Sequence, residues 1–452
     1  MIRKLLFSLI AASCMAAAQP TVLMISVDGL RPDYITRAEQ HGVSAPHLRE
    51  FMAKGTYAEG VLGVLPTVTY PSHTTLVSGV WPDEHGIINN TTFDPRMENM
   101  GGWYWYAQDI KVRTLWDAAA DAGLVTASVG WPVTVSEKNI RYNIPEYWRA
   151  GNDEDRKLLR AISTPDLIED MEANFGPYPN GRLTDPESDR VRVKVALRLL
   201  SKYHARFLTL HLSALDHTQH LTGPFSKEAC AVLEQIDAMI GQLVKGVRAE
   251  DPHAVVLVVS DHGFVRTDHY VNLFVPFVTH GLISIRRSAS PLSQKPDILA
   301  WEAAPWGAGG SAAIQLAHPN DRKIYEQTRT MLKALAADPA NGIARVLEKE
   351  EFEKMGGFKG ASFAVDLSPG YQMGSAFEGP LVTPARPSGM HGYFPDRPEL
   401  RASFFAMGEG IAAHRSLGIV DMRQIAPTVA GILGVSLPEA KMSPLAIGST
   451  KR

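Results

Sequence analysis

The sequence predicts an α/β protein whose central, largely parallel sheet is flanked by helices. Short apolar runs rich in β-branched residues alternate with longer stretches of helical pattern, which is typical of buried parallel strands joined by helical crossovers. Strands are expected at residues 21–27, 125–130, 207–212, 254–260 and 403–407. Helices are expected at residues 114–122, 190–203 and 227–247.

Composition supports a large folded core. Of the 452 residues, 45% are hydrophobic and 21% are charged, which excludes a disordered or collagen-like chain. Lys and Arg number 45 against 48 Asp and Glu, so no electrostatic footprint for nucleic-acid polymers is expected. The two cysteines, Cys14 and Cys230, are too few for a disulfide framework or a Cys-rich zinc module.

The first eighteen residues are expected to be a signal peptide. Arg3 and Lys4 are followed by a short apolar segment at 5–12 and by three alanines at 16–18 that offer a cleavage site. A lipoprotein anchored through Cys14 is the less favoured alternative. The expected signal peptide predicts an exported protein, periplasmic or secreted. No apolar run reaches the ~20 residues that a membrane-spanning helix needs.

The remaining chain is expected to divide into a core interrupted by a cap. Residues 19–283 form the first part of the core and residues 384–452 the last part. Between them, at 284–383, the strand–helix alternation loosens into glycine-rich and proline-rich spans with one mixed helix at 322–336. This segment is interpreted as an inserted cap subdomain.

Six candidate metal ligands follow strands or lie in loops marked by glycine and proline: Asp28, Asp216, His220, Asp261, His262 and His391. Chemistry in parallel sheets gathers at the carboxyl ends of the strands. Equal numbers of carboxylate and imidazole suit zinc, and three ligands for each ion would serve two ions with open positions. Two such ions ~4 Å apart clamp the attacking and leaving oxygens of a displacement at phosphorus. A single Asp or His in such a position is usually an ordinary turn, surface or core residue. The prediction of a metal site therefore depends on all six residues occurring together.

A nucleophile candidate, Thr69, lies at the start of an expected helix. Pro71 and the apolar run behind it indicate a first helical turn, where unpaired N–H groups favour an anion. Coordination to a metal is one way to activate a threonine hydroxyl. By itself such a helix start is usually a plain cap, and His73, His85, His217 and His269 are interpreted as ordinary residues.

Taken together these blocks resemble the nucleotide pyrophosphatase/phosphodiesterase family of the alkaline phosphatase superfamily. The resemblance is carried by the segments at 26–34, 65–79, 81–90, 216–224, 260–263 and 389–393. It implies an alkaline-phosphatase-like core and hydrolysis of phosphodiester or phosphoanhydride bonds by an enzyme with two zinc ions. Asp28, Asp261 and His262 would hold the zinc that activates Thr69, and Asp216, His220 and His391 the zinc that stabilises the leaving oxygen.

The resemblance also implies a covalent phospho-threonine at Thr69. Asn90 and the Thr69 backbone N–H would donate to the phosphoryl oxygens. For the substrate it implies stacking of a nucleobase on Tyr70. Tyr142, Tyr147 and Trp148 are candidates for a second aromatic wall, the alternative being that these aromatic residues pack the cap. Tyr147 is the favoured choice. A small nucleotide diester is therefore favoured, with lipid or choline phosphodiesters as alternatives.

Rival functions differ in what they require of the same site. A phosphomonoesterase needs extra positive charge for a terminal phosphoryl group, for which the candidates are Lys111, Arg113, Arg141 and Arg149. A phosphonate hydrolase is more distant, and a sulfatase is disfavoured because position 69 lacks that family's motif. A non-catalytic binding protein would be favoured if Thr69 or a ligand were missing, and none is. The oligomeric state is left open.

Overall fold

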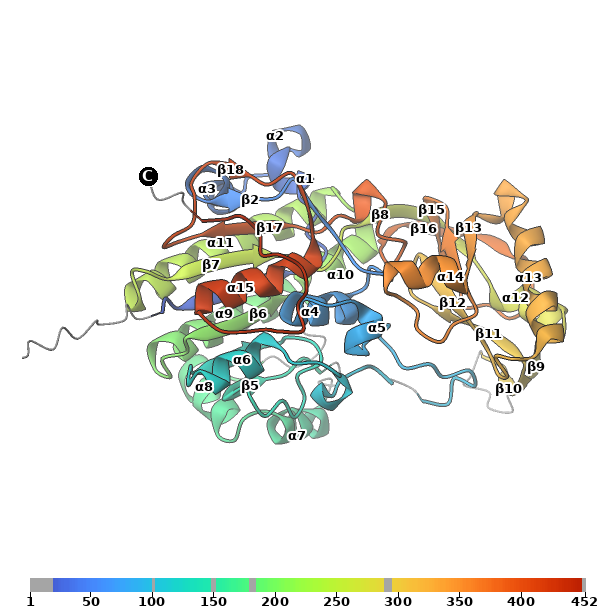
Figure 1. Ribbon diagram of the computed structural model, residues 1–452, viewed down its shortest axis with the longest axis horizontal. Coiled ribbons are helices and arrows are strands. Elements are labelled where there is room, and N and C mark those ends of the chain that lie inside the picture. The colour runs from blue at the N-terminus through green and yellow to red at the C-terminus, as the bar shows by residue number, and fades with distance from the viewer. Residues whose placement is uncertain (1–18, 100–101, 148–151, 179–183, 288–294, 449–452) are drawn as a thin grey trace, which may run out of the picture.

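An eight-stranded sheet forms the centre of the larger lobe in the computed structural model (Figure 1). The structure describes residues 19–99, 102–147, 152–178, 184–287 and 295–448. The expected signal peptide, together with Cys14, Trp148 and Arg149, lies outside the described residues.

Five adjacent strands of this sheet are parallel, in the order β7-β1-β6-β4-β5. They are β7 (Val255–Val259), β1 (Val22–Val27), β6 (Phe207–Leu212), β4 (Thr126–Val129) and β5 (Tyr142–Ile144). At the other edge β17 (Phe404–Met407) and β2 (Thr56–Tyr57) run antiparallel to their inner neighbours, followed by β18 (Arg415–Ser416). The predicted α/β class with a largely parallel sheet is confirmed, and the last predicted strand is its antiparallel member.

The central strand, β1, separates two hydrophobic cores. Its side chains alternate between the faces of the sheet, as a strand's period of two requires. Leu23, Ile25 and Val27 face one core, while Val22 and Met24 face the other. All six residues of the strand are buried, which explains why all of them except Ser26 are apolar.

Helices cover both faces of the sheet (Figure 1). The first core is closed by α3 (Pro46–Lys54), α8 (Leu167–Phe175), α9 (Pro186–Ser201) and α11 (Lys227–Glu250), and the second by α4 (Thr69–Ser78), α6 (Leu115–Asp121) and α15 (Ile425–Leu433). Helix α9 begins four residues before the predicted start because Asp185 accepts hydrogen bonds from the N–H groups of Glu187 and Ser188. The other helices of this lobe are α1 (Asp33–Thr36), α2 (Ala38–His41), α5 (Pro82–His85), α7 (Asp153–Ile162) and α10 (Ala214–Thr222), and β3 (Gly60–Leu62) pairs with β19 (Ile419–Asp421).

A second lobe holds smaller sheets of its own. Four antiparallel strands have the order β11-β12-β14-β13, and three more have the order β15-β8-β16. Their bounds are β8 (Val265–Val271), β11 (Ala303–Gly307), β12 (Ser311–Leu316), β13 (Ile343–Glu348), β14 (Phe363–Leu367), β15 (Gly370–Met373) and β16 (Val382–Met390). The hairpin β9 (Ile283–Arg286) and β10 (Asp297–Trp301) and the helices α12 (Phe274–Thr279), α13 (Arg322–Ala336) and α14 (Lys349–Phe352) complete it. The predicted cap at 284–383 lies within this lobe, whose first strand begins earlier, at Val265.

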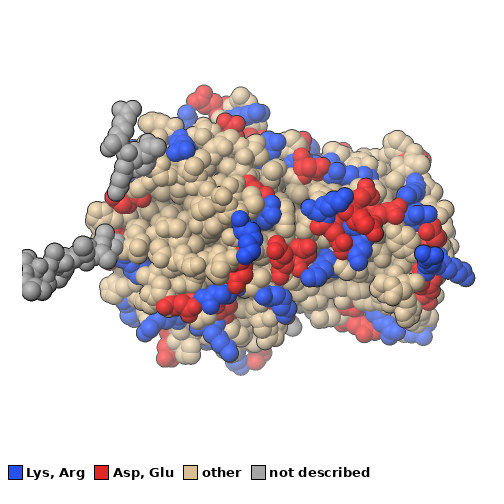
Figure 2. Space-filling view, viewed as in Figure 1, with Lys and Arg blue, Asp and Glu red and all other residues tan. Residues whose placement is uncertain are grey.

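The surface carries both signs of charge. Figure 2 shows Lys and Arg side chains next to Asp and Glu, crowded over the second lobe and sparser over the sheet lobe. Within the described part of the chain, no helix combines the length and the apolar character needed to cross a bilayer.

Candidate active site

Three neighbouring parallel strands deliver most of the predicted ligands to one edge of the sheet. Asp28 directly follows β1, and Asp261 with His262 follows β7. Strand β6 leads into α10, where Asp216 and His220 are four residues apart and share one helix face. His391 comes from the second lobe, directly after β16. The structure brings all six predicted ligands together at this edge.

The six side chains form two groups of three. In each group, Asp28 with Asp261 and His262, and Asp216 with His220 and His391, the candidate ligand atoms lie within 4.8 Å of one another. His262 Nε2 is 3.0 Å from Asp261 Oδ2 and 3.4 Å from Asp28 Oδ1. His220 Nε2 lies 3.4 Å from Asp216 Oδ1. The groups adjoin, because the rings of His262 and His391 stack with centroids 3.7 Å apart.

Hydrogen bonds to backbone carbonyl oxygens determine which ring nitrogen of each histidine faces its ligand group. The Nδ1 atoms of His220, His262 and His391 lie 3.0–3.1 Å from the carbonyl oxygens of Gly389, Gly263 and Thr67, respectively. A carbonyl can only accept, so Nδ1 carries the hydrogen and donates it. The lone pair is left on Nε2, which is the arrangement of histidines that ligate metals.

The three carboxylates each keep one oxygen free. Asp28 Oδ1, Asp216 Oδ1 and Asp261 Oδ2 are buried and have no hydrogen-bond partner among the described residues. Burial, with the charges of Asp261 and Asp216, raises the pKa of Asp28 well above its ordinary value. Burial, with the neighbouring His262 and His220, holds the pKa of His391 well below its ordinary value. Buried carboxylate oxygens without hydrogen-bond partners, crowded beside imidazole nitrogens, are the environment that a divalent cation would complete.

Each group offers carboxylate oxygen and imidazole nitrogen, which are donors that zinc accepts. Zinc takes Asp oxygen and His nitrogen at ~2.0–2.2 Å in tetrahedral sites, so neighbouring ligand atoms stand ~3.3 Å apart. Four carboxylate–imidazole separations within the groups, 3.0–3.7 Å, lie around this spacing. The two groups differ in access, since Asp28, Asp261 and His262 are at most 3% exposed while the side chains of Asp216 and His220 are 18% and 29% exposed.

Thr69 is the first residue of α4 and borders the buried group. Its Oγ1 is 3.5 Å from His262 Nε2, and the residue is 7% exposed. His73, one turn later, is fully buried; its Nδ1 donates to the Thr69 carbonyl oxygen at 2.8 Å, and its Nε2 lies 2.8 Å from Ser26 Oγ on β1. His73, interpreted from the sequence as an ordinary residue, therefore ties the start of this helix to the central strand.

Asn90 lies beside the same helix start. Its Oδ1 accepts the Tyr70 N–H at 2.8 Å, so the donors left to its side chain are those of the amide nitrogen. Asn89 anchors this loop, because its Oδ1 accepts from Asn90 N and its Nδ2 donates to the Gly307 carbonyl oxygen of the second lobe.

The aromatic residues around the site are arranged differently from the prediction. Tyr70 is 0% exposed, in an apolar cluster with Ile87 and Trp105, so its ring has no free face for a nucleobase in this structure. Stacking of a nucleobase on Tyr70 would therefore require its ring to leave this cluster. Partly exposed surface in the cluster belongs to Trp103, whose ring is 5.2 Å from that of Tyr70, and to Tyr147, which packs against Trp105.

Next to Trp103 lies a cavity of about 600 Å³ between the loop after Asn90 and the second lobe. Its apolar walls include Phe93, Met97, Trp103, Phe274, Trp306 and Met373. Sequence reasoning did not find this cavity, because its walls come from segments up to about 280 residues apart whose aromatic residues carry no common pattern.

Comparison with known proteins identifies relatives of this chain. Residues 22–394 match the family described as type I phosphodiesterase / nucleotide pyrophosphatase. Human ectonucleotide pyrophosphatase/phosphodiesterase family member 1 is 27% identical over 254 residues, which cover 54% of this chain and 23% of the human protein. Venom phosphodiesterase of Naja atra is 27% identical over 256 residues, 54% of this chain and 26% of that protein. The matches thus span about a quarter of the length of these relatives.

Solved structures show the same fold. Murine ectonucleotide pyrophosphatase/phosphodiesterase 5, an inactive variant in complex with AMP, superposes with a TM-score of 0.65 at 19% identity, covering 95% of this chain and 98% of that one. The human counterpart gives 0.64 at 19% identity, with 92% and 95% covered. This likeness confirms the alkaline-phosphatase-like architecture. The match over residues 22–394 shows that the chain belongs to the type I phosphodiesterase / nucleotide pyrophosphatase family.

Proposed function

We propose that this protein is an exported hydrolase that cleaves phosphodiester or phosphoanhydride bonds, with Thr69 as its nucleophile and two zinc ions as cofactors. The observation that carries the proposal is the convergence of six ligands in two adjoining groups, with Thr69 Oγ1 bordering the buried one. Export rests on residues 1–18 alone and stays a prediction from the sequence.

Each side chain would have a defined task in the reaction. Asp28, Asp261 and His262 would hold one zinc, and Asp216, His220 and His391 the other. Such ions, when bound, acidify a hydroxyl and stabilise the attacking and leaving oxygens. Thr69 Oγ gives its proton to solvent and bonds to phosphorus while the bond to the leaving oxygen breaks; the leaving oxygen departs with the electron pair and takes up a proton from solvent. Water then attacks the phospho-threonine, which still carries the retained substituent, and releases Thr69 and a monoester.

The start of α4 would support the phosphoryl group. The Thr69 N–H is one of the first N–H groups of the helix, which have no partner within it, and the adjacent Tyr70 N–H is already used by Asn90. The Thr69 N–H and the Asn90 amide are the donors proposed for the non-bridging oxygens. Donors set in place before the reaction stabilise developing negative charge without reorganisation.

A diester is favoured over a monoester because three of the four candidate cations for a terminal phosphoryl dianion are engaged elsewhere, and the fourth, Arg149, lies outside the described residues. Arg113 pairs with Asp121, Lys111 donates to the Gln108 carbonyl oxygen, and the Arg141 guanidinium lies over the Tyr142 ring. The cavity beside Trp103 offers room for a substituent, and partly exposed Trp103 and Tyr147 offer faces on which a nucleobase would stack. A nucleotide diester is therefore the proposed substrate class.

The experiment compares Thr69→Ala with Thr74→Ala, a matched loss of a buried hydroxyl from the same helix. Turnover of bis-p-nitrophenyl phosphate should disappear in Thr69→Ala and persist in Thr74→Ala, with two zinc ions per chain in both. Mass spectrometry of acid-quenched wild-type enzyme should find the adduct on Thr69. Activity retained by Thr69→Ala would refute the covalent role.

A substrate panel tests the class of ester. It contains bis-p-nitrophenyl phosphate, the nitrophenyl ester of thymidine monophosphate, p-nitrophenyl phosphate and glycerophosphocholine. The nucleotide diester should have the highest kcat/KM. A preference for p-nitrophenyl phosphate would overturn the diesterase assignment, and one for glycerophosphocholine would overturn the nucleotide assignment.

A further inference from the structure

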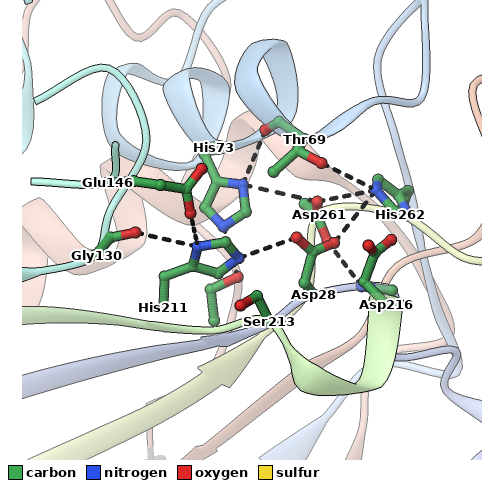
Figure 3. A network of polar contacts seen from close by, with 12 residues as sticks. Asp28, Thr69, His73, Gly130, Glu146, His211, Ser213, Asp216, Asp261 and His262 are labelled. Atoms are coloured by element: carbon green, nitrogen blue, oxygen red, sulfur yellow. Dashed lines mark hydrogen bonds and ion pairs between the residues drawn. The ribbon is translucent and has the colours of Figure 1, made fainter. Parts of the chain in front are cut away.

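A buried histidine that belongs to neither ligand group, His211, lies behind the metal ligands on β6. It is 0% exposed within an otherwise mostly apolar strand. Its Nε2 is 3.0 Å from Asp28 Oδ2, and its Nδ1 is 2.7 Å from Glu146 Oε2 and 3.1 Å from the Gly130 carbonyl oxygen (Figure 3). Glu146, which follows β5, is itself only 2% exposed. A chain of three side chains thus runs from the metal group into the protein interior.

This contact determines which oxygen of Asp28 is available. With Oδ2 accepting from His211, the other oxygen, Oδ1, has no hydrogen-bond partner among the described residues and lies 3.4 Å from His262 Nε2. The carboxylate is therefore held with one oxygen toward the ligand group and one away from it. Glu146 and the Gly130 carbonyl hold the ring from the opposite side, so it cannot rotate without losing both contacts.

Asp28 differs from the neighbouring ligands in how it is held. Backbone carbonyls orient His262, His220 and His391, and the Gly29 N–H donates to Asp261 Oδ1 at 3.0 Å. Asp28 Oδ2 is instead held by a side chain that belongs to neither ligand group. A substitution can consequently remove this support while the backbone stays intact.

We propose that His211, oriented by Glu146, is a positioning residue that sets Asp28 for metal binding in the group Asp28, Asp261 and His262. This inference rests on the proposed function, because it concerns the same metal centre. Side chains that orient a metal ligand typically contribute 10–100-fold to metal affinity. The effect should be confined to this group, since His211 contacts none of Asp216, His220 and His391 in the hydrogen bonds and ion pairs of the described residues.

Two substitutions separate positioning from packing. In His211→Gln the terminal amide nitrogen takes the place of Nε2 and keeps a donor for Asp28. In His211→Asn the shorter amide takes the place of Nδ1, keeps a partner for Glu146 and leaves Asp28 Oδ2 without one. His211→Gln therefore loses the contact with Glu146, and His211→Asn loses the contact with Asp28. Both variants lack the imidazole ring.

The measurement is metal binding and does not depend on turnover. Zinc affinity of each site is obtained by competition with a chromophoric chelator, and Co²⁺ absorption reports the geometry of each bound ion. His211→Asn should weaken one of two sites 10–100-fold and alter its Co²⁺ spectrum, while His211→Gln should stay within about threefold of the wild type. Glu146→Gln, which keeps the volume, should weaken the same site by less than His211→Asn does.

Equal losses in His211→Asn and His211→Gln, or equal weakening of both sites, would overturn the positioning role. Circular dichroism of the metal-free protein shows whether His211→Asn folds. If it does not fold, the result for Glu146→Gln is used instead. Unchanged zinc affinity in Glu146→Gln, or an equal loss of affinity at both sites, then overturns the proposal. Wild-type protein that binds no zinc would instead refute the proposed function. Wild-type protein with two sites that the variants leave unchanged refutes this inference only.

Discussion

Replacing Asn90 tests whether its amide serves the reaction or only the fold. Its Oδ1 is committed to the Tyr70 N–H at 2.8 Å, so the fold uses the acceptor and the amide nitrogen is left for substrate. Asn90→Ala removes both functions. Asn90→Asp keeps an acceptor for Tyr70 and removes only the donor.

The magnitudes of the two effects differ. Loss of one donor to a developing oxyanion costs ~3–4 kcal/mol of barrier, which is about 100- to 1,000-fold in kcat. Loss of the hydrogen bond to Tyr70 costs ~1 kcal/mol of folding free energy. Asn90→Ala should therefore be both slow and less stable, whereas Asn90→Asp should be at least as slow with stability near the wild type.

The assay is steady-state hydrolysis of bis-p-nitrophenyl phosphate, with urea unfolding of the same preparations. The loss should appear in kcat, because the donor acts on charge that develops in the transition state. If Asn90→Asp kept kcat within threefold of the wild type, or if only KM rose, the Asn90 amide would not be a transition-state donor.

Three further changes have defined outcomes. EDTA should abolish hydrolysis and lower the thermal midpoint, and Zn²⁺ should restore both, because a ligand that binds only the folded state stabilises it; activity that is indifferent to chelators would contradict the two-metal site. Trp103→Ala should raise KM for the thymidine ester by about 5- to 100-fold, from ~1–3 kcal/mol of stacking, and affect glycerophosphocholine little; equal losses on both substrates would exclude stacking. The hydrogen bond from Arg198, with others from Lys202 and Tyr203, holds the pKa of Asp170 well below its ordinary value, so the stability it contributes is present above about pH 4 and is lost as pH falls. Asp170→Asn should therefore lower the thermal midpoint at pH 7 and approach the wild type near pH 2, and an equal difference at both pH values would contradict the linkage.

The sheet was predictable because its inner strands are buried on both faces. Strand β6 has the predicted bounds, and β1, β4 and β7 differ from them by one residue at one or both ends. The position of the candidate site was predictable for the same reason, because residues that follow the carboxyl ends of neighbouring parallel strands lie at one edge of the sheet. His391 was predicted from its glycine-marked loop and its role from the family motif, because no local pattern shows that β16 returns the chain from the second lobe to that edge.

The burial of Tyr70 and the pairing of His211 with Glu146 were not predictable in this way. Tyr70 adjoins Thr69 in sequence, but helix geometry turns its ring into a cluster with Trp105, which lies 35 residues further on. The sequence does indicate His211, because it is a titratable residue within a mostly apolar strand. Once buried, such a residue requires a polar partner. The partner, Glu146, is 65 residues away, so only the fold identifies it.

The unequal burial of the two ligand groups matches the division of labour in the proposed reaction. The nucleophile must be held in one position, and the group beside Thr69 is enclosed and supported by His73, His211 and the Gly29 N–H. A leaving group must depart and water must enter, and Asp216 and His220 are the ligands that remain partly exposed. Substitutions behind the enclosed group should therefore act through geometry and metal affinity, whereas substitutions around the open group should act through access and substrate choice.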